Sequence, residues 1–203
     1  MEYTKIPRES YTPGEGVNVR WLFTDVINER GYKDLVEIGV FQGKFSRYLL
    51  LHTNDTHLSC VDPWAEGYMH KSGNQIPGEN VYQFACRRLK GFGDRVDMLR
   101  MPSLEGAKTF EDSSLDFVFI DGDHSYQAVI DDILAWWPKV RPGGVLAGHD
   151  YGILTRRKHA AMKIVKQEVA NVHKAVHTLF DEVGEVVERP GFTRSWWVTK
   201  NPC

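Results

Sequence analysis

The chain has 203 residues, which is enough for one domain with a sizeable hydrophobic core. Hydrophobic residues make up 42% and charged residues 26%, and the formal net charge of −2 gives no overall attraction to nucleic acid or an anionic membrane. Cys60, Cys86 and Cys203 show no CxxC spacing, which indicates reduced thiols and a cytoplasmic setting. No apolar run is long enough to span a membrane, and the N-terminus lacks the apolar stretch of a signal peptide.

The order of apolar and polar residues predicts a polar arm over residues 1–16, followed by a single domain over residues 17–203. A first helix is expected over 17–30, and short strands then alternate with amphipathic helices. Strands are expected at 35–40, 57–61, 96–101, 115–120 and 144–148, and helices at 44–52, 79–89, 103–110, 126–140 and 157–183. A long polar loop over 65–78 is typical of a lid, and two strands are expected near the C-terminus around Arg189-Pro190-Gly191.

This alternation predicts an α/β fold of the Rossmann-like type, with a mostly parallel sheet and helices on both of its faces. The C-terminal pair of strands is expected to add an antiparallel strand at the edge. Ligands of such sheets bind beyond the carboxyl ends of the strands. The residues at or just past those ends are Glu37, Gly39, Gly43, Asp62, Asp121 and Asp150.

The turn after the first predicted strand has the spacing ExGxxxG. Gly39 and Gly43 would let backbone approach a ligand at a helix N-terminus, although Phe41 replaces a glycine of the dinucleotide-binding motif. Glu37 could balance an ammonium group, and Asp62 could accept hydrogen bonds from a ribose diol. S-adenosylmethionine (SAM) carries both groups. The alternative is an ordinary strand–helix turn with an incidental acid.

Several segments resemble class I SAM-dependent methyltransferases, and more narrowly the small family that includes sugar and macrolide O-methyltransferases. They are VEIGVFQGKFSRYLL, CVDPW, LDFVFIDGDHSYQAVIDDILAWWPKVRPGGVLAGHDY and SWWVTK, and the resemblance spans about residues 33–200. It implies a seven-stranded sheet with a reversed last strand. It also implies cofactor-binding roles for Glu37, Gly39 and Gly43 along the methionine part, Asp62 at the ribose, Met101 and Ser103 beside the adenine, and Asp121.

The segment FIDGDHSY places Asp121, Asp123 and His124 in one turn after a strand, and Asp150 follows the next strand. Asp121 and Asp150 are therefore expected side by side, where they could hold a divalent metal, Mg²⁺ or Mn²⁺, while His124 takes a proton from the acceptor. Metal-dependent relatives have an acidic pair where this chain has His149-Asp150. A histidine ligand suits Mn²⁺ or Fe²⁺ better than Mg²⁺. Alternatively, His149 is a second catalytic acid–base group and no metal binds.

Other conspicuous residues have structural explanations. Asp131-Asp132 is expected on the solvated face of a helix, and Ser125 suits a helix N-cap better than Asp121 does. Trp196-Trp197 is expected to bury one ring, while the other could line the substrate pocket. Trp64 and Tyr68 could stack on a sugar ring or cover the end of the sheet. His70, in the long loop, could touch substrate.

The resulting hypothesis is a SAM-dependent O-methyltransferase whose acceptor is a hydroxyl of a sugar or glycosylated small molecule. Nucleic acid and membranes are not expected as partners, and a homo-oligomer is compatible with a polar arm that could reach a neighbouring subunit. Three alternatives stay open: a catechol-type phenol O-methyltransferase, an NAD-dependent oxidoreductase, and a SAM-binding module without catalysis.

Overall fold

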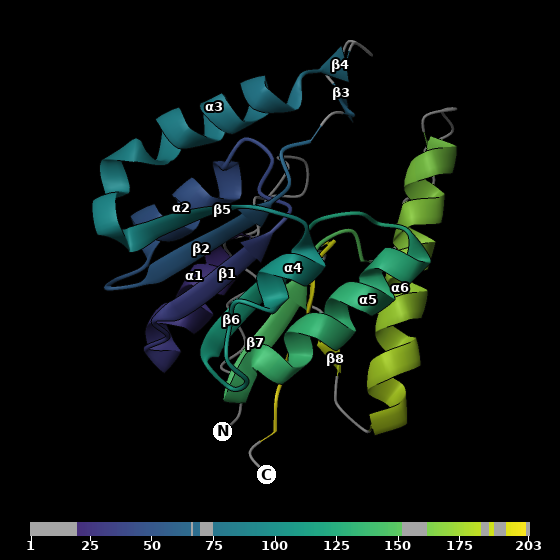
Figure 1. The fold of residues 1–203 in the computed structure, drawn as a ribbon. Coiled ribbons are helices and arrows are strands. Elements are labelled where there is room, and N and C mark those ends of the chain that lie inside the picture. The colour runs from purple at the N-terminus through teal and green to yellow at the C-terminus, as the bar shows by residue number, and fades with distance from the viewer. Residues whose placement is uncertain are drawn as a thin grey trace, which may run out of the picture.

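A computed structural model describes residues 20–65, 67–69, 75–151, 162–183, 187–188 and 194–201. Within these residues one sheet has seven strands in the order β5-β2-β1-β6-β7-β9-β8, and helices cover both of its faces (Figure 1). The predicted arm over 1–16, together with His70 and Cys203, lies outside the described residues. The α/β, Rossmann-like fold predicted from the sequence is confirmed.

The strands of the main sheet are β1 (Asp34–Ile38), β2 (His57–Asp62), β5 (Val96–Arg100), β6 (Leu115–Ile120), β7 (Val140–Gly148), β8 (Val187–Glu188) and β9 (Trp196–Thr199). The helices are α1 (Arg20–Arg30), α2 (Lys44–His52), α3 (Gly78–Leu89), α4 (Ser103–Ala107), α5 (Tyr126–Trp136) and α6 (Met162–Val183). Two 3₁₀ segments are η2 (Lys90–Arg95) and η3 (Trp137–Lys139). The predicted loop over 65–78 contains two short paired strands, β3 (Tyr68–Met69) and β4 (Gln75–Ile76).

The sheet separates two hydrophobic cores. Because side chains alternate along a strand, Phe117 and Phe119 of β6 face one core while Val118 and Ile120 face the other. The first core lies under α1, α2 and α3, and the second lies under α4, α5 and α6 (Figure 1). Within the described part of the chain, no helix has both the length and the apolar character that crossing a membrane requires.

The last strand, β9, runs antiparallel to β7, as predicted, but it is not the edge of the sheet. β8 pairs with its outer side, so β9 is an interior strand. The two hydrophobic cores cover both faces of β9, because Trp196 and Trp197 pack into opposite cores and each is less than 10% exposed. The expectation that one of these rings could line a substrate pocket is wrong.

The segment between α5 and β7 also differs from the expected pattern. The helix predicted to reach residue 140 ends at Trp136 and continues as the short 3₁₀ segment η3, in which Pro138 cannot donate a helical hydrogen bond. β7 begins already at Val140, and its pairing with β6 is interrupted by a bulge. Gly143 lies in the bulged part with a φ of 81°. Glycine tolerates this conformation. Regular pairing with β6 resumes at Val145, which is where the apolar strand pattern begins.

Backbone hydrogen bonds hold the carboxyl ends of the central strands together beyond the regular sheet. Asp121 N donates to Ile38 O at 2.8 Å, Gly39 N donates to Val61 O at 3.0 Å, and His149 N donates to Ile120 O at 3.0 Å. Gly39 has a φ of 82°, and a Cβ at this position would lie 2.2 Å from Asp121 O. The turns that carry the candidate functional residues are therefore fixed to one another by backbone contacts that exclude a side chain at Gly39.

We expect Gly39→Ala to lower the free energy of unfolding by about 2–4 kcal/mol, because the new methyl group collides with backbone and the left-handed φ is strained. Gly91→Ala is the matched control, since nothing lies within 4 Å of its added Cβ. The control should change stability by less than about 0.5 kcal/mol. Urea denaturation of both variants measures the difference, and equal stabilities would contradict the proposed contact.

Candidate active site

A cavity of about 470 Å³ lies beyond the carboxyl ends of β1, β2 and β6, where parallel sheets bind ligands. Four of the predicted cofactor-binding residues line it: Gly39, Asp62, Ser103 and Asp121. Its wall also includes Asp132, which the sequence analysis had placed elsewhere. The volume is within the range of small-molecule sites.

The other three predicted cofactor-binding residues do not line this cavity. The Glu37 carboxylate is buried and accepts a 2.5 Å hydrogen bond from Ser46 Oγ on α2. Gly43 caps the N-terminus of α2 with a φ of 67°. Met101 is partly buried against the core under α4, α5 and α6. Glu37 and Gly43 therefore support the turn after β1 from the side of α2.

Asp62, at the end of β2, ties two turns together at the cavity. Its Oδ2 accepts from Phe41 N at 2.9 Å, and its Oδ1 accepts from Trp64 N at 2.7 Å. Trp64 Nε1 in turn donates to Phe41 O at 2.8 Å. A carboxylate has about four acceptor positions, so Asp62 can still accept from a bound diol. The Trp64 ring is 1% exposed, so it covers the end of the sheet and does not offer a surface for stacking on a sugar.

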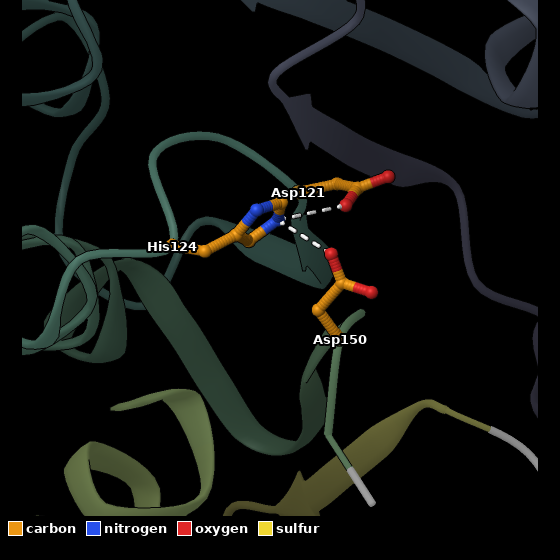
Figure 2. Close-up of side chains that lie close together, drawn as sticks. All are labelled: Asp121, His124 and Asp150. Carbon is orange, nitrogen blue, oxygen red and sulfur yellow. Dashed lines mark hydrogen bonds and ion pairs between the residues drawn. The ribbon is translucent and has the colours of Figure 1, made fainter. Parts of the chain in front are cut away.

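A histidine lies between two carboxylates next to the cavity. His124 Nε2 is 3.4 Å from Asp121 Oδ1 and 3.2 Å from Asp150 Oδ2, and Figure 2 shows the ring pointing at both acids. Asp121 follows β6, His124 precedes α5, and Asp150 follows β7 with a left-handed φ of 55°. Ser125 Oγ accepts from Ala128 N and so caps α5, which leaves Asp121 outside the helix cap.

His149 and Arg194 contact the other carboxylate oxygen of Asp150. His149 Nδ1 is 3.1 Å from Asp150 Oδ1 and 3.7 Å from Asp121 Oδ1. The Arg194 guanidinium contacts the same Asp150 oxygen. Burial on its own would raise the pKa of Asp150, but the hydrogen bond from His149 and the charges of His149, His124 and Arg194 outweigh it, and the pKa lies below its ordinary value.

Sequence reasoning missed Arg194. It lies 44 positions after Asp150 and becomes its neighbour only because β9 runs antiparallel beside β7. A backbone hydrogen bond from Tyr151 N to Arg194 O, 2.8 Å long, fixes this crossing point. The Arg194 guanidinium therefore already provides a positive charge beside the acidic pair, Asp121 and Asp150.

The side chains that could hold a metal differ from the predicted set. Donor atoms of Asp121, His124 and Asp150 lie within 4.8 Å of one another, whereas His149 was expected in place of His124. Two carboxylates with an imidazole form a donor set that suits Mn²⁺ or Fe²⁺ better than Mg²⁺. The residues thus fit a divalent cation, which would share Asp150 with Arg194.

Asp132 was expected on the solvated face of a helix, and this expectation is wrong. It is 5% exposed, and its Oδ1 accepts a 2.5 Å hydrogen bond from Ser103 Oγ, which accepts from Trp136 Nε1 at 2.9 Å. Burial raises the pKa of Asp132 to about 6, the nearby charges of Asp131 and Asp123 add to this, and the Ser103 bond opposes it. The helical spacing of the sequence indicates this burial, because position 132 lies on the apolar stripe of α5 between positions 129 and 136.

The comparisons with known proteins agree with this fold. Residues 36–151, more than half of the chain, match the family described as "Methyltransferase domain". The SAH-bound methyltransferase PaMTH1 of Podospora anserina has a similar structure, with a TM-score of 0.70 and 14% identity over 90% of this chain and 78% of that one. The O-methyltransferase TomG of Streptomyces achromogenes, in complex with SAM, gives a TM-score of 0.58 and 16% identity over 90% and 79%. At these identities the likeness establishes a shared fold.

A curated relative, the uncharacterized protein y4gI of Sinorhizobium fredii, is 31% identical over 121 residues. The match covers 57% of this chain but 13% of that relative, and a second curated relative is matched over 50% of its length. The chain thus spans half or less of the length of the curated relatives that it matches.

We expect Asp132→Asn to raise the free energy of unfolding of the ligand-free protein at pH 7. In the folded protein Asp132 keeps its proton up to about pH 6, because its pKa is about 6, whereas in the unfolded protein it loses the proton near its ordinary pKa of 3.8. Stability is therefore lost as the pH rises from about 4 to about 6. About two pKa units correspond to a gain of up to about 3 kcal/mol for a neutral side chain.

Urea denaturation at pH 5 and pH 7 measures this difference. Asp131→Asn is the control, because it removes an equal charge from a side chain that is less buried and accepts a hydrogen bond from Gln127. A variant Asp132→Asn that is less stable than the wild type at pH 7 would refute the assignment of a destabilising buried charge.

Proposed function

This chain belongs to the methyltransferase-domain family, and on that premise we propose that it transfers a methyl group from SAM to a hydroxyl of a sugar or glycosylated small molecule. The observation that carries the proposal is the His124 imidazole between Asp121 and Asp150, beside a cavity that Asp121 also lines. A sugar hydroxyl is a weak acid and a poor nucleophile, so it gains from a base placed at this point.

The cofactor is proposed to lie along the strand ends. Asp62 would accept from the ribose hydroxyls, and Gly39, which also lines the cavity, allows the turns after β1 and β6 to meet in backbone contact. Glu37 and Gly43 would shape the methionine end from beneath the turn, since neither lines the cavity. The adenine would lie toward the segment after β5, near Met101 and Ser103.

In the proposed reaction the acceptor oxygen attacks the methyl carbon in line with the sulfonium sulfur. The new C–O bond would form as the C–S bond breaks, and S-adenosylhomocysteine (SAH) would leave. The hydroxyl proton would move to Nδ1 of His124, because Nε2–H is the group that donates to Asp121 and Asp150. The Asp121 and Asp150 carboxylates orient the ring and stabilise the imidazolium that results. His149 and Arg194 hold Asp150 ionised and in place. Positioned bases of this kind contribute typically about 10²–10⁴-fold in rate.

A divalent cation is a further part of the proposal. Asp121 and Asp150 would hold it with His149, whose Nδ1 lies 3.7 Å and 3.1 Å from their Oδ1 atoms. His149 is proposed in place of the nearer donor His124, because an imidazole bound to a metal could not also serve as the base. When bound, such a cation would act as a Lewis acid on the acceptor oxygen. Arg194 already supplies positive charge at Asp150, so the cation is proposed to add to that charge.

The competing functions make different demands on the same residues. A catechol is more acidic than a sugar hydroxyl and needs less help from a base. An NAD-dependent oxidoreductase needs close backbone approach to a pyrophosphate, which Phe41 in the turn after β1 disfavours. A SAM-binding module without catalysis would have no use for a histidine held between two acids.

We expect His124→Ala to lower methyl transfer to a sugar acceptor by at least about 100-fold, because the base is lost. With a catechol acceptor the loss should be less than about tenfold. His52→Ala is the matched control, since His52 is exposed on α2 and should leave turnover unchanged. Transfer of label from SAM across a panel of sugars, nucleotide sugars and phenols measures both. A nearly silent His124→Ala on a sugar acceptor would refute the assigned base.

We expect millimolar Mn²⁺ to raise the melting temperature of the wild type by several degrees, because a ligand that binds only the folded state stabilises it. Asp150→Asn should abolish this shift. Thermal unfolding with and without Mn²⁺, after treatment with a chelator, is the measurement. An unchanged melting temperature in the wild type would remove the metal from the mechanism and leave the His124 base intact.

A further inference from the structure

Asp132 is an acid whose position the reaction does not explain. It is buried on the core side of α5, yet it lines the cavity. Its Oδ1 is occupied by Ser103, whereas its Oδ2 has no hydrogen-bond partner among the described residues. That oxygen lies near Gly122, 3.7 Å from the point where a Cβ on this glycine would be. A buried carboxylate with one oxygen committed and the other at a cavity wall is poised to accept a hydrogen bond from a ligand.

We propose that Asp132 recognises the exocyclic amino group of the cofactor's adenine, an inference that rests on the proposed use of SAM. The sulfonium has to face the acceptor near Asp121 and His124, and Asp62 would hold the ribose. The base lies on the far side of the ribose from the sulfonium. The base is proposed to lie toward the segment after β5. Ser103 lies in that segment and donates a hydrogen bond to Asp132, and both residues line the cavity.

The chemistry of the two partners is complementary. The adenine amino group presents two N–H donors, and a carboxylate presents only acceptors. With a pKa of about 6, Asp132 is mostly ionised at pH 7. Hypoxanthine has a carbonyl oxygen where adenine has this amino group, so it would set two acceptors against each other. Asp132 should therefore discriminate adenine from hypoxanthine, because a mispaired buried polar group is costly.

Two neighbours act as positioning residues. Ser103 Oγ donates to Oδ1 and accepts from Trp136 Nε1, so its hydroxyl proton is directed at the carboxylate. Trp136 is fully buried, which fixes the start of this chain of hydrogen bonds in the core. The order Trp136–Ser103–Asp132 thus leaves Oδ2 as the oxygen offered to a ligand.

The test compares binding of SAH and S-inosylhomocysteine, which differ at the purine 6-position, to the 203-residue chain by calorimetry at pH 7. The wild type should bind SAH about tenfold more tightly or better, as expected for a hydrogen bond to a charged group. Asp132→Asn should reduce the preference below about threefold or reverse it, since Ser103 retains the amide oxygen and the amide N–H groups face the base. Ser103→Ala should give an intermediate preference.

Asp131→Asn is the control, and it should keep the wild-type preference, because Asp131 borders the same cavity but bonds to Gln127. Equal binding of the two compounds by the wild type would overturn the inference, and so would an unchanged preference in Asp132→Asn. In both cases SAH still binds and the proposed function stands. If the wild type binds NAD⁺ and not SAH, the proposed function fails, and the assignment of Asp132 fails with it.

Discussion

The contact between the turns after β1 and β6 is the constraint on which the site depends. Gly39 lies against the carbonyl of Asp121 at a distance that no side chain allows, and the Asp121 amide bonds back to Ile38. This contact fixes the position of the Asp121 backbone, and therefore the position of its carboxylate relative to His124 and Asp150. The same turn carries Phe41, whose amide is held by Asp62. One close backbone approach thus relates the proposed cofactor end of the cavity to the proposed catalytic end.

Around His124, the proposed base, basic and acidic side chains alternate. Two carboxylates, Asp121 and Asp150, lie among the imidazoles of His124 and His149 and the guanidinium of Arg194. Positive neighbours lower the pKa of Asp150 despite its burial, so this acid stays ionised and can hold an imidazole in one orientation. As the proposed base, His124 would alternate between neutral and charged forms beside a carboxylate, Asp150, that stays ionised.

The end of the cavity that is proposed to take the adenine shows the opposite balance. Asp132 lies among apolar residues with a single hydroxyl donor, and burial raises its pKa to about 6. Such a group lowers the stability of the ligand-free fold at neutral pH. A cofactor that donates a hydrogen bond to it would recover part of that loss, so specificity and stability are opposed at this position. Ser103 and Trp136 offset part of this loss of stability, because their chain of hydrogen bonds fixes one carboxylate oxygen of Asp132.

The sequence by itself determined the architecture and much of the site. Apolar strands alternating with helical patterns allow only a few packings, so the parallel sheet, and with it the proximity of Asp121, His124 and Asp150, followed from local spacing. Tertiary structure alone decided the rest, because those contacts join residues without a local signature. Arg194 reaches Asp150 only through the antiparallel insertion of β9, and Glu37 turns toward Ser46 because α2 packs on that face of β1. Asp132 looked solvated because its charge outweighed its helical position, and only the packing of α5 against α4 showed it to be buried at a cavity wall.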